Sequence, residues 1–319
     1  MWPDLTTSHL LTANTSRGAN PVPFLHRTSG PEDPPFAGPS PELPHARLSA
    51  IYDLVIPMHF GTRRRTLFGM YHPALEPRRR RGVLILNPWG SEYFRAHRSL
   101  RHMAISLAER GLDVLRFDYF GTGDSFGRDQ DTSVSGSLDD GEMALDELAA
   151  VAGVRKVSLV GLRLGATLAG HLAERRPREV DRVVFWDPVW QGADLVGEWG
   201  VGAAIDGNRA PASLTSREGT EVEVHGFVLP SSLLQELSTL SLDHRPGEHI
   251  RLLTARSVWD GGPDDRDPAG AHRSDSINIV ARETTEIFDP SPPCWVEEED
   301  FGAGAIPMNL IRKIAEWME

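Results

Sequence analysis

The sequence predicts an α/β fold with a mostly parallel central sheet flanked by helices, and three observations support this prediction. Short apolar runs typical of buried strands alternate with segments of helical periodicity from Gly82 to Asp187. One of these runs, within residues 156–172, passes through a glycine-flanked turn directly into a helix. The alternation stops over residues 188–247 and then resumes, which predicts a small cap inserted into a single domain.

The predicted domain spans residues 47–319, and a proline-rich tail of residues 1–46 precedes it. The tail holds nine prolines and has no apolar periodicity, so we expect it to be disordered. It is either an over-extended gene start or a functional tail.

The elements follow from the spacing of apolar residues. An antiparallel hairpin is expected from Tyr52–Met58 and Thr66–Tyr71, around a turn at Gly61-Thr62. Continuous apolar runs suit strands that are covered on both faces, whereas the helices need one apolar stripe. The predicted strands are Gly82–Asn87, Leu112–Asp118, Lys156–Gly161, Arg182–Asp187, His249–Thr254 and Ser276–Ala281. The predicted helices are Phe94–Arg110, Ser137–Val151, Leu162–Leu172, Pro230–Leu240 in the cap, and Ile306–Trp317.

The turn after the strand at residues 156–161 has the form G-x-Z-x-G, which is the nucleophile elbow of α/β-hydrolases. Position Z is Arg163, and a protonated guanidinium has no lone pair with which to attack a carbonyl. In this fold the triad histidine follows the last strand. The last histidine of the chain, His272, precedes the expected strand Ser276–Ala281. We therefore expect two of the three triad positions to be empty.

Three motifs resemble the serine-aminopeptidase-like branch of the α/β-hydrolases. Residues 115–125 read LRFDYFGTGDS and resemble its R-x-D-x-R-G-x-G-x-S segment after the fourth strand. Asn87–Gly90 stands where that branch has its His-Gly-x-Gly oxyanion segment. The elbow at Gly161–Ala166 resembles the subgroup of exosortase-A-associated hydrolases, which also carry arginine there. The resemblance covers residues 48–319 and implies an α/β-hydrolase fold with a small cap.

Arg163 is the leading candidate site residue. It is expected at the N-terminus of a helix, where backbone amides and the helix dipole favour anions. It would therefore either receive a carboxylate, phosphate or enolate, or form an ion pair with Asp118, Asp187 or Asp260.

The oxyanion hole of this fold consists of backbone N–H groups, here those of Trp89 and Leu164. The pocket beside them would be open unless the side chain of Trp89 or Arg163 plugs it. Asp187 and Asp260 stand where the triad acid can occur, and would act as a base or neutralise Arg163.

Three further residues could carry chemistry near the elbow. His97 or His225 would supply a titratable imidazole from above the site. Cys294 would be a nucleophile only beside a base that lowers its pKa. No cofactor or metal is expected, because Gly121–Gly127 has the wrong glycine spacing for a dinucleotide fingerprint. His97 and His102 are likewise spaced wrongly for zinc.

The composition limits the partners. A net charge of -12 argues against binding to nucleic acid. With one cysteine the chain cannot form an internal disulfide, and no segment reads as a transmembrane helix or secretory signal. We expect a cytoplasmic protein with a small-molecule or peptidyl ligand that is anionic, and no membrane partner.

Three functions compete at this stage. The first is a degenerate hydrolase that binds an acyl or peptidyl intermediate of a biosynthetic pathway. The second is a non-hydrolytic enzyme, an isomerase, epimerase, cyclase or lyase, that holds an enolate with Arg163 and the oxyanion amides. The third is a hydrolase with an unrecognised nucleophile. A cavity lined by Arg163 would favour the second, whereas an Arg163 locked into an ion pair would favour the first.

Overall fold

A computed structural model describes residues 54–200, 216–217, 221–242, 247–258, 280–296 and 304–319. The tail at residues 1–46 lies outside the described residues. So do Asp260, a candidate triad acid, and His272, the last histidine of the chain. The fold and the site are accordingly built from the remaining segments.

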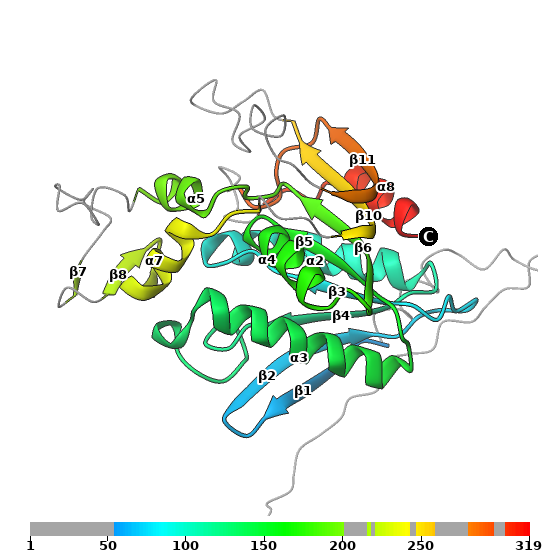
Figure 1. Cartoon of the computed structure of the whole chain (residues 1–319), viewed down its shortest axis with the longest axis horizontal. Helices are drawn as coiled ribbons and strands as arrows, with labels where there is room; N and C mark the ends of the chain where they lie inside the picture. The colour runs from blue at the N-terminus through cyan, green and yellow to red at the C-terminus, as the bar shows by residue number, and fades with distance from the viewer. Residues whose placement is uncertain (1–53, 201–215, 218–220, 243–246, 259–279, 297–303) are drawn as a thin grey trace, which may run out of the picture. The chain divides into compact units, whose positions relative to one another are not determined.

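An eight-stranded sheet forms the centre of the domain, in the order β1-β2-β4-β3-β5-β6-β10-β11 (Figure 1). Its strands are β1 (Ile56–Thr62), β2 (Arg65–His72), β3 (Gly82–Leu86), β4 (Asp113–Asp118), β5 (Val157–Leu162), β6 (Val180–Trp186), β10 (Gly247–Ser257) and β11 (Ala281–Asp289). The β2 strand pairs antiparallel with β1 and β4, and all other neighbours in this sheet pair parallel. The predicted mostly parallel sheet is confirmed.

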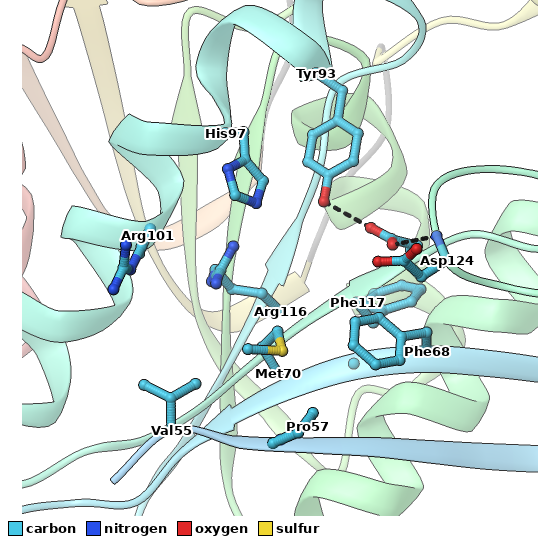
Figure 2. Close-up of a pocket in the computed structure, with 12 residues that line it drawn as sticks. Val55, Pro57, Phe68, Met70, Tyr93, His97, Arg101, Arg116, Phe117 and Asp124 are labelled. Carbon is cyan, nitrogen blue, oxygen red and sulfur yellow. Dashed lines mark hydrogen bonds between the residues drawn. The ribbon is translucent and has the colours of Figure 1, made fainter. Parts of the chain in front are cut away.

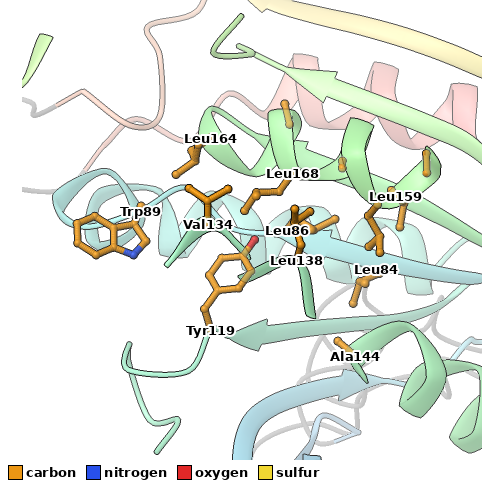
Figure 3. Close-up of a cluster of buried hydrophobic side chains, with 14 of the residues drawn as sticks. Leu84, Leu86, Trp89, Tyr119, Val134, Leu138, Ala144, Leu159, Leu164 and Leu168 are labelled. Carbon is orange, nitrogen blue, oxygen red and sulfur yellow. The ribbon is translucent and has the colours of Figure 1, made fainter. Parts of the chain in front are cut away.

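Helices cover both faces of the sheet. On one face lie α2 (Ser91–Ala108) and α8 (Met308–Met318), and on the other α3 (Val134–Ala152) and α4 (Leu164–Arg175). Side chains alternate along each strand, so Val83 and Ile85 pack with α2 and α8. Leu84 and Leu86 pack with α3 and α4 (Figure 3). Burial on both faces explains the continuous apolar runs in the sequence.

The segment between β6 and β10 contains the small elements expected of a cap. They are α5 (Gly192–Glu198), β7 (Ser216–Arg217), β8 (Glu221–Val224), β9 (Phe227–Pro230) and α7 (Ser231–Thr239). The three strands form a separate antiparallel sheet. A β-bridge between Gln191 and Ser241 joins the two ends of this insertion. The segment therefore leaves and re-enters the domain at one place.

Two elements differ from the prediction. The first hairpin turns at Arg63-Arg64, and Gly61 lies inside β1 with a φ of 91°. A side chain at Gly61 would collide with the Arg65 carbonyl, so this glycine serves the pairing of the strands rather than the turn. The last strand among the described residues is Ala281–Asp289; residues 276–279 of the predicted strand Ser276–Ala281 lie outside the described residues. As an edge strand it pairs on one side only and keeps polar, exposed residues, so it lacks an apolar run.

Candidate functional site

The turn from β5 into α4 has the geometry of a nucleophile elbow. Arg163 sits at its apex with φ 55° and ψ -120°, a backbone conformation that non-glycine residues rarely adopt. Its N–H donates to the Trp186 carbonyl at 3.0 Å, and its carbonyl accepts from the Ala166 N–H at 2.9 Å. Bonds to a neighbouring strand and to the first turn of α4 thus hold the strained residue in place.

The two glycines of the motif are required by close backbone contacts. A side chain at Gly161 would collide with the Gly165 carbonyl, and one at Gly165 would collide with the Leu86 and Asn87 carbonyls. The start of α4 therefore lies directly against the end of β3, as the motif predicts.

The Arg163 side chain is buried, with 1% of its surface exposed, and it is engaged by two glutamates. Its Nε and Nη2 lie 3.2 and 3.1 Å from Oε1 of Glu92, in the first turn of α2. Its Nη2 also donates to the carboxylate of Glu198, at the end of α5. An ion pair of Arg163 therefore exists, and among the described residues its partners are Glu92 and Glu198 rather than Asp118 or Asp187.

The two aspartates in question have other partners. Asp118 accepts from the hydroxyl of Tyr93 at 2.6 Å and from the backbone N–H of Asp124 at 2.9 Å. Asp187 accepts from the N–H and hydroxyl of Ser257 at 2.6 and 2.9 Å. Both carboxylates are therefore held by neutral donors.

A tryptophan reaches the elbow from the segment after the last strand. The guanidinium of Arg163 lies over the ring of Trp295, 3.9 Å from its centroid. The indole Nε1–H of Trp295 donates to Asp187 Oδ2 at 3.2 Å. In a triad it is a histidine that bonds the acid. Here Trp295 bonds Asp187 and stacks with Arg163, and neither the arginine nor the tryptophan is a nucleophile or a base.

Negative charge is in excess around the elbow. Glu92 and Glu198 raise the pKa of Arg163 against the opposing effect of burial, and Asp187 adds to this. Burial, together with the neighbouring Glu92, raises the pKa of Glu198. Oε2 of Glu92 is buried without a hydrogen-bond partner among the described residues. Since one cation faces three carboxylates, the cluster does not favour a further anion.

Beside the elbow lies a cavity of about 230 Å³ with mostly apolar walls. Trp89 lines it, whereas Leu164 and Arg163 do not. Figure 3 shows the Trp89 ring at the edge of the buried cluster, near Tyr119. Trp89 also contacts two residues of the inserted segment, Trp199 and Phe227, at centroid distances of 5.9 and 6.3 Å. The elbow is thus occupied by the Arg163 side chain, and among the described residues the cavity beside it lies around Trp89.

The remaining candidates divide by accessibility. His97 lines the cavity, and burial together with Arg116 lowers its pKa. His225 is exposed in the turn between β8 and β9 and does not line this cavity. Cys294 is fully buried, which raises the pKa of its thiol, so it lacks the activation that a nucleophile needs.

Three residues that matter at the elbow were not found from sequence. Glu92 and Glu198 lie 71 and 35 positions from Arg163, and Trp295 lies 108 positions from Asp187. A usable signal existed only for Glu92, an acidic residue two positions after the oxyanion segment Asn87–Gly90.

Comparison with known proteins supports the fold. No protein-family description and no curated protein matches the chain. Among solved structures, it is similar to ferulic-acid-bound Est1E from Butyrivibrio proteoclasticus, with 14% identity, TM-score 0.60 and coverage of 82% and 97% of the two chains. It is also similar to a putative hydrolase from Agrobacterium vitis S4, with 16% identity, TM-score 0.55 and coverage of 83% and 97% of the two chains. A further similar structure is mouse alpha/beta hydrolase domain-containing protein 10, with 20% identity, TM-score 0.52 and coverage of 82% and 98%. The chain has the α/β-hydrolase fold.

Proposed function

We propose that this protein is a degenerate α/β-hydrolase-fold protein that binds an acyl or peptidyl group without hydrolysing it. The observation that carries the proposal is the state of Arg163, which is 1% exposed and paired with Glu92 and Glu198 at the place of the nucleophile. Fold alone does not confer hydrolysis, so the argument rests on these side chains.

The locked arginine disfavours chemistry at the elbow in two ways. A substrate carbonyl could reach the elbow only by displacing Arg163 from its glutamates, and separating a buried ion pair costs about 3–5 kcal/mol. If it did reach the elbow, neither Arg163 nor Trp295 could act as nucleophile or base. The same pairing argues against an enolate held by Arg163, because Glu92 and Glu198 already occupy the guanidinium.

The cavity beside Trp89 suits the apolar part of a ligand. Aromatic side chains from three parts of the fold line it, namely Trp89 after β3, Tyr119 after β4 and Phe227 on β9. At about 230 Å³ it is smaller than the usual pocket of a drug-sized ligand, which favours a short acyl chain or one apolar side chain of a peptide. An apolar wall supplies affinity by removing such a group from water.

We propose a finer placement of the protein from the same residues. The motif at Gly161–Ala166 and the filled elbow agree with a place in the arginine-bearing exosortase-A-associated subgroup and with a role in a biosynthetic pathway. Among the described residues no helix is long and apolar enough to cross a membrane. The single cysteine agrees with our proposal of a cytoplasmic location.

Hexanamide and p-nitrophenyl hexanoate, both uncharged, test binding and hydrolysis separately. Hexanamide should bind saturably and change the tryptophan fluorescence, because Trp89 lines the cavity. The nitrophenyl ester should be hydrolysed at the rate of buffer alone. Ester turnover well above buffer, or no saturable binding of hexanamide, would contradict the proposal.

Phe227→Ala and Val228→Ala form a matched pair on β9. Neighbouring side chains on a strand point to opposite faces, and Val228 does not line the cavity. Loss of the phenyl wall should weaken hexanamide by about 1–2 kcal/mol, or roughly five- to thirtyfold. Val228→Ala should bind like the wild type. Equal affinity of both variants would place the ligand elsewhere.

A further inference from the structure

A second cavity, of about 510 Å³, lies between α2, the β1–β2 hairpin and β4 (Figure 2). It shares Tyr93 and His97 with the cavity beside Trp89, so these two side chains stand between the two spaces. Neither Arg163 nor its glutamates line it. It is therefore a separate cavity, and the residues of the elbow give it no role.

The cavity contains a buried arginine that forms no salt bridge with a carboxylate among the described residues. Arg116 lies on β4 between Leu115 and Phe117, which pack into the core on the α3 and α4 side, so its own side chain faces α2. Figure 2 shows it pointing toward His97. It is 5% exposed, and its Nε donates to Nε2 of His72 at 3.3 Å. Among the described residues no carboxylate forms a salt bridge with Arg116.

The partner of Arg116 does not neutralise it. His72 is itself buried, and burial followed by the charges of Arg116 and Arg101 lowers its pKa to about 3, so it is uncharged at neutral pH. Asp118 also lines the cavity, but it accepts hydrogen bonds from Tyr93 and Asp124 and acts on Arg116 only at longer range. A desolvated cation in this position gains stability from any anion that reaches it.

The rest of the cavity indicates what kind of anion fits. Arg101 and His97, both on α2, form the rim, and the exposed side chain of Arg101 adds positive charge near the mouth. On the opposite side from α2, Met70 and Pro57 form an apolar floor (Figure 2). A charge-assisted bond to a guanidinium suits a carboxylate, and the floor suits a short hydrocarbon chain.

We propose that this cavity is a second ligand site, which binds a small monocarboxylate with a short apolar chain. The carboxylate accepts from the buried guanidinium of Arg116, with Arg101 at the mouth, and the chain lies against Met70 and Pro57. The site is independent of Arg163 and of the acyl-binding role proposed above.

Calorimetric titration with butyrate and with butyramide, its neutral isostere, at fixed ionic strength tests the charge directly. Butyrate should bind measurably more tightly than butyramide and than formate, which has the charge but no chain. Arg116→Gln should weaken butyrate about ten- to a hundredfold, since it removes a charged donor. The unliganded variant should melt no lower than the wild type, because an unpaired buried cation does not stabilise the fold.

Three further variants make the result specific. Arg101→Gln, at the rim, should weaken butyrate by a smaller factor and provides a second test if Arg116→Gln fails to fold. Arg98→Gln, exposed on the same helix but outside the cavity, should bind like the wild type. Phe227→Ala should leave butyrate affinity unchanged, which separates this site from the cavity beside Trp89. Equal binding of butyrate and butyramide, or butyrate affinity that survives loss of both Arg116 and Arg101, would overturn the proposal.

Discussion

Replacing Arg163 by alanine should destabilise the fold rather than merely empty a binding site. The substitution leaves Glu92 buried with neither of its oxygens paired, since Oε2 already lacks a partner. It also removes the cation from the ring of Trp295. The substitution does not relieve the backbone strain of the positive φ at this position, because alanine is as strained there as arginine is.

The expected cost follows from these losses. Removing one partner of a buried ion pair costs about 3–5 kcal/mol. Loss of the stacked cation adds about 0.5–2 kcal/mol, and relaxation of the surrounding side chains into the vacated space returns part of the total. We therefore expect a net loss of about 3–5 kcal/mol. Since a domain of this size loses about 2–4 °C for each kcal/mol, the melting temperature should fall by roughly 6–20 °C.

Denaturant unfolding of four proteins measures this: the wild type, Arg163→Ala, Glu92→Gln and the double variant. The double variant should be more stable than the sum of the single losses predicts, by about 1–3 kcal/mol, because the two groups interact directly. Arg175→Ala is the control on the same helix; it breaks exposed ion pairs and should cost less than about 1 kcal/mol. If the free energy of unfolding of Arg163→Ala were within 1 kcal/mol of the wild-type value, and showed no coupling to Glu92, the buried ion pair would not stabilise the fold.

Three further outcomes are expected. Arg163→Ser should not hydrolyse p-nitrophenyl butyrate faster than buffer, because Trp295 can donate but cannot accept a proton from the new hydroxyl; clear turnover would reveal a base outside this account. Trp295→Phe should lower the free energy of unfolding by about 1–2 kcal/mol, since Asp187 loses a donor in a buried site; an unchanged denaturation midpoint would show that this bond is not stabilising. Deletion of residues 1–46 should shift the melting temperature by less than about 2 °C, as a proline-rich segment without apolar periodicity has little to bury, whereas a larger drop would mean that it packs on the domain.

The elements of the fold that could be predicted from sequence are those with local signals. The elbow was one, because Gly161 and Gly165 are needed by backbone contacts within a few residues of themselves and with β3. The buried strands were others, because each is covered on both faces. The edge strand Ala281–Asp289 was missed since its alternating polar side chains face solvent, and an apolar run just before it was preferred.

The candidate site was predictable in its position but not in its chemistry. That Arg163 excludes nucleophilic attack followed from its side chain alone. Its partners did not, because Glu92 and Glu198 are brought to it by α2 and α5, which are separate elements far along the chain. Trp295 could not be predicted, because the triad pattern of this fold has a histidine, not a tryptophan, after the last strand. The sequence shows Arg116 only as one residue of the motif at residues 115–125. Only the structure shows that it is buried and that no described carboxylate forms a salt bridge with it.

The most direct test of the central claim, that the elbow carries no reactive nucleophile, is the intact mass of the folded wild-type protein after incubation with a fluorophosphonate. Such a probe forms a covalent adduct with an activated serine. With Arg163 at the elbow and Trp295 bonded to Asp187, the mass should remain that of the unmodified chain, as it should for heat-denatured protein treated in parallel. Stoichiometric addition of one probe molecule to a serine of the folded protein would contradict the account.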